Sequence, residues 1–188
     1  MNRLLLVTLI LFGLNSTAQA GVYLEPYIGY NIGIIKYDAI VAATNVPSLS
    51  VSDALTGPSF GARVGWSLPA IWIAADYATG TLSSKLDGGT NNDFTLTRLG
   101  ATVGFHWLPL VTPWVGYVLS SKLDQKSATN EYEGKGLKAG LGLTMFPFVS
   151  LNLEYLLIEY DDKTVGTLKY KNIKDNGLYF SVSLPLDL

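Results

Sequence analysis

The sequence has no cysteine and a single histidine, His106, among its 188 residues. The missing thiols exclude disulfide bonds, thiolate metal sites and a lipid-modified N-terminal cysteine. One histidine offers too few nitrogen ligands for a zinc centre. Glu159, Asp161 and Asp162 form an acidic group, which we interpret as a solvated loop rather than a cation site. The glycines recur at strand spacing and form no phosphate-binding loop, so we expect no cofactor.

Charge is also scarce, and this limits the possible partners. Charged residues make up 15 % of the chain and the formal net charge is −2. Nucleic-acid binding requires a basic face, which this balance does not provide. After residue 20 the sequence lacks a long apolar run, although 48 % of the whole chain is hydrophobic. This combination indicates that the hydrophobic residues are distributed by alternation.

The first twenty residues have the layout of a secretory signal peptide. Arg3 supplies the positive charge, residues 4–14 form an apolar run, and Ala18-Gln19-Ala20 is a small-x-small cleavage site. The apolar run is too short to span a bilayer as a helix. We therefore expect residues 1–20 to be removed and residues 21–188 to form one domain.

Residues 21–188 alternate between apolar and small or polar side chains in eight segments. Successive side chains of a strand point to opposite faces, so each segment is expected to be a strand with one apolar face. In the first segment that face carries Val22, Leu24, Pro26, Ile28, Tyr30, Ile32 and Ile34. Short turns at Pro69, Pro109 and Pro147 alternate with longer polar stretches at 39–56, 82–93, 122–133 and 159–175. Such hairpins are typical of transmembrane barrels.

A soluble barrel would also alternate, with its apolar face turned inward. Here the other face carries glycine, alanine, serine and tyrosine with few charges, which suits the narrow interior of an eight-stranded barrel. The sequence therefore predicts an all-β fold, an eight-stranded antiparallel up-and-down transmembrane β-barrel over residues 21–188. Phe94 and Leu96 break the alternation, and we expect either a bulge there or a rise of the strand above the membrane.

The last segment, LYFSVSLPLDL at 178–188, alternates up to the end of the chain. In this, and in its eight hairpin-forming segments, the chain resembles the small outer-membrane barrels of the OmpA-domain, OmpX and OmpW type. Leu188 stands where that family usually has an aromatic residue. The resemblance implies an outer membrane of Gram-negative type, both termini in the periplasm, and a monomer. It also implies contact with outer-membrane lipid, including lipopolysaccharide, and with the barrel-assembly machinery through the last strand.

Six charged residues have inward parity, three of each sign: Glu25, Arg63, Asp76, Arg98, Lys138 and Glu154. Ionisable groups inside a membrane protein usually pair. We interpret them as a polar network that plugs the lumen, while a gated polar path for small solutes stays open as an alternative. Arg63 and Asp76 are expected to lie opposite each other across the turn at Pro69.

Aromatic residues collect where the segments meet the short turns, and those expected to form an interfacial girdle are Trp66, Phe105, Trp107, Phe146 and Phe148. His106 lies near the same turns. It has no serine partner in the pattern of lipid-modifying barrels, so we predict no enzyme.

The function expected is a structural or surface-interaction role with four external loops, whose ligand the sequence does not identify. The alternative is a narrow channel for small or apolar solutes, as the OmpW resemblance implies. A lipid-modifying enzyme ranks third.

Overall fold

The computed structural model describes residues 20–41, 49–85, 92–106, 110–126, 130–146, 148–165 and 167–188, without the side chains of Val41, Leu49, Lys85, Met145, Phe146 and Val165. No described helix is long and apolar enough to cross a membrane. The strands are β1 (Gly21–Val41), β2 (Leu49–Ser67), β3 (Ile71–Lys85), β4 (Asn92–Phe105), β5 (Val111–Gln125), β6 (Glu131–Phe146), β7 (Val149–Tyr160), β8 (Lys163–Val165), β9 (Leu168–Ser183) and β10 (Leu186–Asp187).

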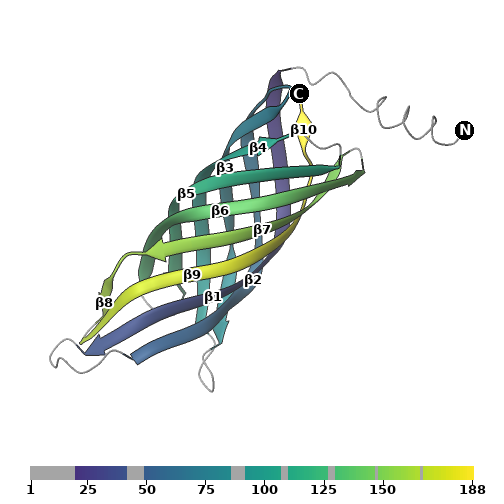
Figure 1. Ribbon diagram of the computed structural model, residues 1–188. Helices are drawn as coiled ribbons and strands as arrows, with labels where there is room; N and C mark the ends of the chain where they lie inside the picture. Colours follow the sequence, from purple (N-terminus) through teal and green to yellow (C-terminus); the bar gives the residue numbers. More distant parts are fainter. Residues whose placement is uncertain are drawn as a thin grey trace, which may run out of the picture.

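The strands form one closed antiparallel barrel (Figure 1). Strands β1 to β7 pair in sequence order, β7 pairs with β9, and β9 pairs with β1. The short strands β8 and β10 extend the edges of β9 and β1. Eight strands therefore build the wall among the described residues, which confirms the predicted fold class.

The two ends of the barrel differ. At one end, called the turn end, β2 and β3 are joined by a three-residue turn, 68–70, near the C terminus. At the other, called the loop end, the strands reach much further than the sequence suggested. β1 continues to Val41 and β2 begins at Leu49, so most of the stretch 39–56 is paired strand. The prediction of four long loops was wrong in this respect, since parts of all four stretches are strand.

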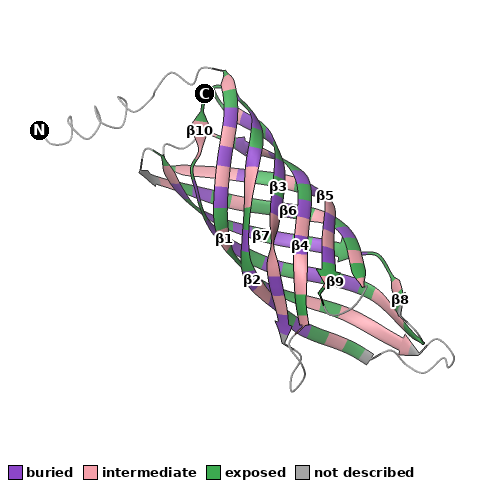
Figure 2. Cartoon of the chain, turned by 180° about the vertical axis from the view of Figure 1, so that it is seen from behind, coloured by how far each residue is buried: buried purple, intermediate pink, exposed green. Residues whose placement is uncertain are grey.

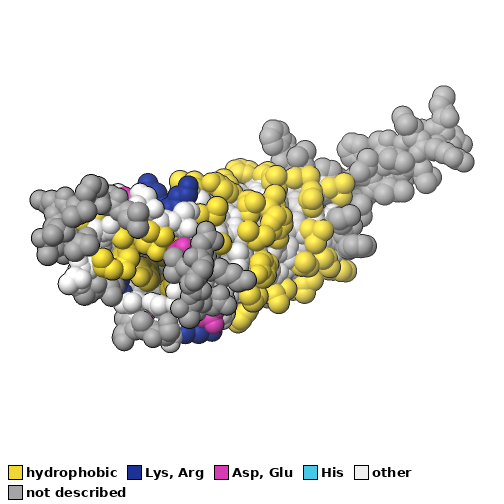
Figure 3. All heavy atoms as spheres, turned by 90° about the horizontal axis from the view of Figure 1, so that it is seen from below, with side chains coloured by type: hydrophobic (Ala, Val, Ile, Leu, Met, Phe, Trp, Pro, Cys, Tyr) yellow, Lys and Arg dark blue, Asp and Glu magenta, His cyan; other side chains and the backbone are white. Residues whose placement is uncertain are grey.

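A band of exposed hydrophobic side chains surrounds the middle of the barrel. Ile28, Phe60 and Leu137 are 59–64 % exposed, and they belong to three different strands. Figure 2 shows exposed and buried residues alternating along the long strands of the wall, and Figure 3 shows the hydrophobic side chains as a belt. An apolar surface of this extent would be unfavourable in water. The chain is thus a transmembrane β-barrel with lipid around this belt.

Toward the loop end the alternation changes sides. Outward positions there are polar, such as Lys36, Thr95 and Glu133, while inward positions become apolar. This is the pattern of a barrel surrounded by water, and it explains why Phe94 and Leu96 break the alternation seen in the belt. β4 keeps its register with β3 across these residues, and its register shift against β5 lies at Leu99 and Gly100, so no bulge falls at Phe94 or Leu96. Instead the strand rises above the belt with its apolar side chains inside, and the strands continue as a sheet because they still bury one face.

The C-terminal strand departs from the expected continuous alternation. β9 ends at Ser183, and the chain resumes pairing only at Leu186 and Asp187, against Leu24 and Tyr23 of β1. Pro185 lies in the gap, and its nitrogen carries no hydrogen to donate to the ladder. The backbone nitrogen of Leu184 still donates to the Pro26 oxygen at 3.0 Å, so the break is local.

Candidate functional site

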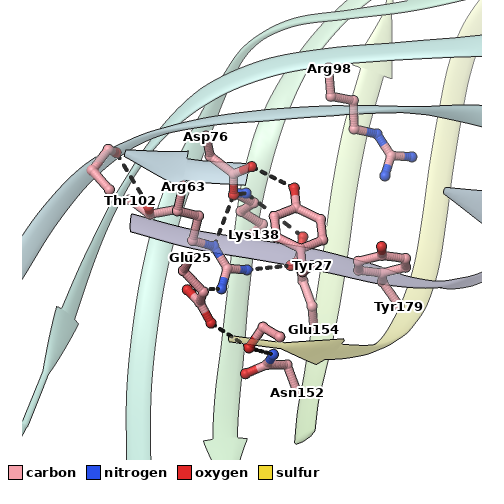
Figure 4. A network of polar contacts seen from close by, with 12 residues as sticks. Glu25, Tyr27, Arg63, Asp76, Arg98, Thr102, Lys138, Asn152, Glu154 and Tyr179 are labelled. Atoms are coloured by element: carbon pink, nitrogen blue, oxygen red, sulfur yellow. Dashed lines mark hydrogen bonds and ion pairs between the residues drawn. The ribbon is translucent and has the colours of Figure 1, made fainter. Parts of the chain in front are cut away.

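The centre of the lumen is a cluster of five charged residues, called the central cluster: Glu25, Arg63, Asp76, Lys138 and Glu154 (Figure 4). Arg63 lies between the three carboxylates. Its Nη1 is 2.8 Å from Glu25 Oε2, its Nε 3.1 Å from Asp76 Oδ2, and its Nη2 3.3 Å from Glu154 Oε2. The Arg63 side chain is 1 % exposed, so these ion pairs replace its water.

Lys138 and three hydroxyl groups complete the central cluster. The Lys138 ammonium pairs with Asp76 and lies 3.9 Å from Glu154 Oε1. The Tyr27 hydroxyl donates to Asp76 at 2.6 Å, while the Tyr23 and Ser183 hydroxyls each donate to Glu25 at 2.6 Å. Three carboxylates face two cations. The Tyr27 and Ser183 hydroxyls donate to oxygens that the cations do not reach, while the Tyr23 hydroxyl shares Glu25 Oε2 with Arg63. The carboxylates are therefore fixed in place from several strands.

Strand register explains how the sequence assembles this cluster. Arg63 pairs with Asp76 on β3, as predicted, and with Glu25 on β1, so three charges lie side by side across three strands. Gly61 gives the Tyr27 ring its place, because a Cβ there would lie 2.6 Å from the ring. The close approach of large side chains to glycine positions lets a narrow barrel hold so many of them.

Arg98, the sixth charge expected in the lumen, lies apart from the central cluster (Figure 4). Its guanidinium donates to Asn31 Oδ1 at 3.2 Å and pairs with Asp175 Oδ2 at 3.5 Å. The sequence pattern does not identify Asp175, because this residue lies in the polar stretch 159–175, whose composition is typical of a loop. Its inward parity in a longer β9 was the signal that could have identified it.

Below the central cluster, toward the turn end, lies an aromatic floor formed by Tyr23, Trp72 and Trp114. Tyr23 stacks on Trp72 with ring centroids 4.8 Å apart. The Arg63 guanidinium carbon lies 4.2 Å from the centroid of Trp114, a cation–π contact. A cavity of about 170 Å³ lies at this end of the lumen, with His106 among its lining residues.

Above the central cluster, toward the loop end, the lumen is filled by an apolar layer whose buried members are Leu55, Leu82, Leu96, Val118, Leu123, Ile158, Tyr160 and Ile173. Over this layer lies a cavity of about 290 Å³, called the loop-end cup. Its lining includes the apolar layer's Leu55, Leu123 and Ile173, three tyrosines and one carboxylate, Asp53. The sequence pattern does not predict this cup, because most of its residues lie in stretches interpreted as loops.

The residues expected to form an aromatic girdle lie partly within the described structure. Trp66, Phe105 and Phe148 are 70 %, 43 % and 66 % exposed, and each lies near a short turn. Trp107 and the Phe146 side chain lie outside the described residues. A girdle of these aromatics stays a prediction.

The described residues offer little for catalysis or metal binding. They contain no group of three or more histidine and acidic residues placed to hold a metal ion. His106 Nε2 lies 3.4 Å from Ser67 Oγ, which is long for a nucleophile–base hydrogen bond. No described carboxylate forms a hydrogen bond or ion pair with the His106 ring, so the third member of a triad is missing from this part of the chain.

Comparison with known proteins supports the fold alone. No family model matches the chain, and no curated protein matches it. Among solved structures, the outer-membrane protein AlkL is 10 % identical, covers 89 % of this chain and 91 % of its own, and gives a TM-score of 0.55. The outer-membrane protein OprG from Pseudomonas aeruginosa is 7 % identical, covers 90 % and 98 %, and gives 0.53. Neisserial surface protein A is 20 % identical, covers 88 % and 98 %, and gives 0.49.

Proposed function

Since the chain has the fold of the small eight-stranded outer-membrane β-barrels, we propose that it is a closed, non-conducting barrel that acts through its loop end. The observation that carries this proposal is the filling of the lumen by three successive tiers, the aromatic floor, the central cluster and the apolar layer. Leu82, Leu96 and Leu123 are at most 1 % exposed, and so is Arg63. Among the described residues, this packing supports a lumen without a continuous path for water or ions.

Electrical recording tests the closed barrel directly. We expect the purified protein, inserted in a planar lipid bilayer, to produce no discrete current steps above the lipid baseline. An open porin added to the same bilayer serves as the positive control for insertion and recording. Regular, repeatable steps from the wild-type protein would contradict the proposal and favour the channel.

A narrow channel for small or apolar solutes is the second candidate function. It is favoured by the positions of the two cavities, because the loop-end cup and the turn-end cavity approach the packed tiers from opposite sides. Arg63 and Glu25 line the turn-end cavity, so a rearrangement of the central cluster would lengthen it. This function requires a second conformation of the lumen. We propose no enzymatic role, given the contacts of His106 described above.

If the barrel lies in an outer membrane, the positions of its termini and the nature of its partners follow. We propose that residues 1–20 are a cleaved signal peptide and that the turn end, with both termini, faces the periplasm. The exposed hydrophobic belt would contact outer-membrane lipid, including lipopolysaccharide, and the alternating β9 would be recognised by the barrel-assembly machinery. Lys122, Glu131 and Glu133 form an ion-pair group on the outward face at the loop end, where water would surround it.

Single cysteines test this orientation cleanly, because the chain has none of its own. Asp162 is exposed between β7 and β8 at the loop end, and Ala70 is exposed in the turn between β2 and β3. We expect a membrane-impermeant maleimide to label Asp162→Cys on intact cells and to label Ala70→Cys only after the cells are broken. Labelling of Ala70→Cys alone on intact cells would mean that the barrel is inserted the other way.

A further inference from the structure

Asp53 is unusual among the buried carboxylates of this barrel. Five carboxylate side chains are buried among the described residues: Glu25, Asp53, Asp76, Glu154 and Asp175. Four of them lie within 4.0 Å of an arginine or lysine nitrogen. Asp53 is 7 % exposed and forms no ion pair with a described lysine or arginine. Its contact is a hydrogen bond that the Tyr37 hydroxyl donates to Oδ2 at 3.3 Å.

This environment leaves the Asp53 charge poorly compensated. Burying an ionised carboxylate is unfavourable unless a cation or several hydrogen-bond donors replace its water. One long hydrogen bond from a neutral hydroxyl replaces little of the water that a carboxylate loses on burial. Burial and the neighbouring Asp53 also raise the pKa of Tyr37, so Tyr37 keeps its proton and adds no charge. Asp53 lines the loop-end cup, so a cation held in this cavity would lie beside its carboxylate.

The walls of the loop-end cup are suited to an organic cation. Tyr37, Phe94, Tyr132 and Tyr170 line the cavity together with Asp53. The Tyr37 and Tyr170 rings meet edge to face with centroids 5.5 Å apart. Aromatic rings attract an ammonium group through the negative potential of their faces. Tyr132 already makes such a contact within the protein: the Lys163 ammonium lies 5.0 Å from the centroid of the Tyr132 ring.

We propose that the loop-end cup binds a small alkylammonium ion, with its charge beside Asp53 and its alkyl groups against the tyrosines and Phe94. A bare metal ion is a poor occupant, because hard cations take six or more oxygen ligands and the cup has one carboxylate. A neutral apolar molecule would leave the buried charge uncompensated. The volume of about 290 Å³ matches the lower end of small-molecule sites.

The ligand is a free solute, because the cup lies above the lipid-facing belt, in the part of the barrel that water surrounds. Apolar groups at the bottom of the cup, Leu55 and Leu123, exclude strongly hydrated ions. Ser84 and Asn92 line the same cavity and offer hydrogen-bond partners to a hydroxyl group on the ligand. This site depends neither on the closed lumen nor on the orientation of the barrel, so its test is independent of the tests above.

Choline and its neutral isostere 3,3-dimethylbutan-1-ol provide a probe pair of equal shape. We expect titration calorimetry of the full barrel, in a maltoside detergent without ammonium groups, to show saturable binding of choline. The neutral isostere should bind at least about tenfold more weakly, since it lacks the charge that Asp53 and the rings recognise. Equal binding of the two probes, or no saturable binding of choline, would overturn the proposal.

Matched variants locate the effect. Asp53→Asn keeps the shape and still accepts the Tyr37 hydrogen bond, and it should weaken choline binding about tenfold while leaving the isostere unchanged. Tyr132→Leu should weaken choline binding several-fold. Asp38→Asn is the control: it removes a carboxylate from the same end of the barrel, where Asp38 accepts from Asn172 and Ser50 outside the cup. If Asp38→Asn weakens binding as much as Asp53→Asn, general surface charge attracts the cation and the site is wrong.

Discussion

Arg63→Ala should lower the unfolding free energy of the barrel by about 3–5 kcal/mol, the typical result of removing one partner from a buried ion pair. The side chain is 1 % exposed and within 3.3 Å of three carboxylates on three different strands. Without it, Glu25 loses its cation, and Asp76 and Glu154 share Lys138 alone. Urea unfolding in lipid vesicles, followed by tryptophan fluorescence, measures the difference.

The exposed ion-pair group at the loop end supplies the control for this measurement. Lys122 also contacts two carboxylates, Glu131 and Glu133, but its side chain is 40 % exposed. Hydrogen bonds to both glutamates raise the pKa of Lys122, yet water screens the pairs, so Lys122→Ala should change stability little. Similar losses for the two variants would mean that the lumen is wet and that the central cluster is solvated.

A double-mutant cycle tests whether Arg63 and Asp76 act through each other. Asp76→Ala should also destabilise the barrel, because it removes the acceptor of Arg63, Lys138 and Tyr27. The double variant should lose less than the sum of the single losses, since each single variant leaves the other charge unpaired. Strict additivity would contradict the direct contact.

The belt region of this barrel was predictable because one physical rule governs it. Lipid outside requires apolar outward residues, and a narrow lumen requires small or paired inward residues, so parity alone assigns each side chain. The same rule places Arg63 opposite Asp76, because the turn at Pro69 sets the register of β2 and β3, and the structure has this pairing. Trp72 and Trp114 also followed it: both have inward parity and both are buried.

The loop end was misread because the environment outside the barrel changes there while the backbone does not. Above the belt, water surrounds the wall, so polar residues such as Lys36 and Thr95 occupy outward positions within regular strands. Judged by its polar residues alone, a strand above the belt therefore resembles a loop. The apolar partners that reveal a strand, among them Leu82 and Phe94, then have the opposite parity. The loop-end cup and Asp175 were missed for this reason, since both need strands that run beyond the belt.

Contacts within the central cluster depend on details that parity does not contain. Lys138 and Glu154 belong to β6 and β7, which do not pair with the strand of Arg63. Their contacts in the central cluster depend on the diameter of the lumen and on side-chain conformation. Arg98 has the same inward parity and the same charge as Arg63 but lies nearer the loop end. There its guanidinium donates to Asn31 and pairs with Asp175. Sequence identified six of the inward charges and paired Arg63 with Asp76, and the three-dimensional structure was needed to group the others.

Gly140→Ala should destabilise the barrel by about 1–3 kcal/mol, the usual range for adding a methyl group to a filled interior. Gly140 pairs with Trp114 across β5 and β6, and the indole lies over the glycine. An added Cβ would lie 2.3 Å from Trp114 Cζ2, far inside van der Waals contact. The indole has little room to withdraw, because it is 2 % exposed and the Arg63 guanidinium lies 4.2 Å from its ring centroid.

Gly142→Ala, two residues further along the same face of β6, is the matched control. Its added Cβ would first meet Asn152 Oδ1 at 2.9 Å and Ser150 Oγ at 3.1 Å, a milder approach, to the ends of two short side chains rather than to a packed ring. Replacing glycine by alanine restricts the unfolded chain equally in the two variants, so their difference measures how far the clash with Trp114 exceeds the milder contacts at Gly142. Urea unfolding in vesicles should therefore show a clearly larger loss for Gly140→Ala. Equal losses would mean that the indole moves freely, and that the cation–π contact of Arg63 with Trp114 does not hold the aromatic floor in place.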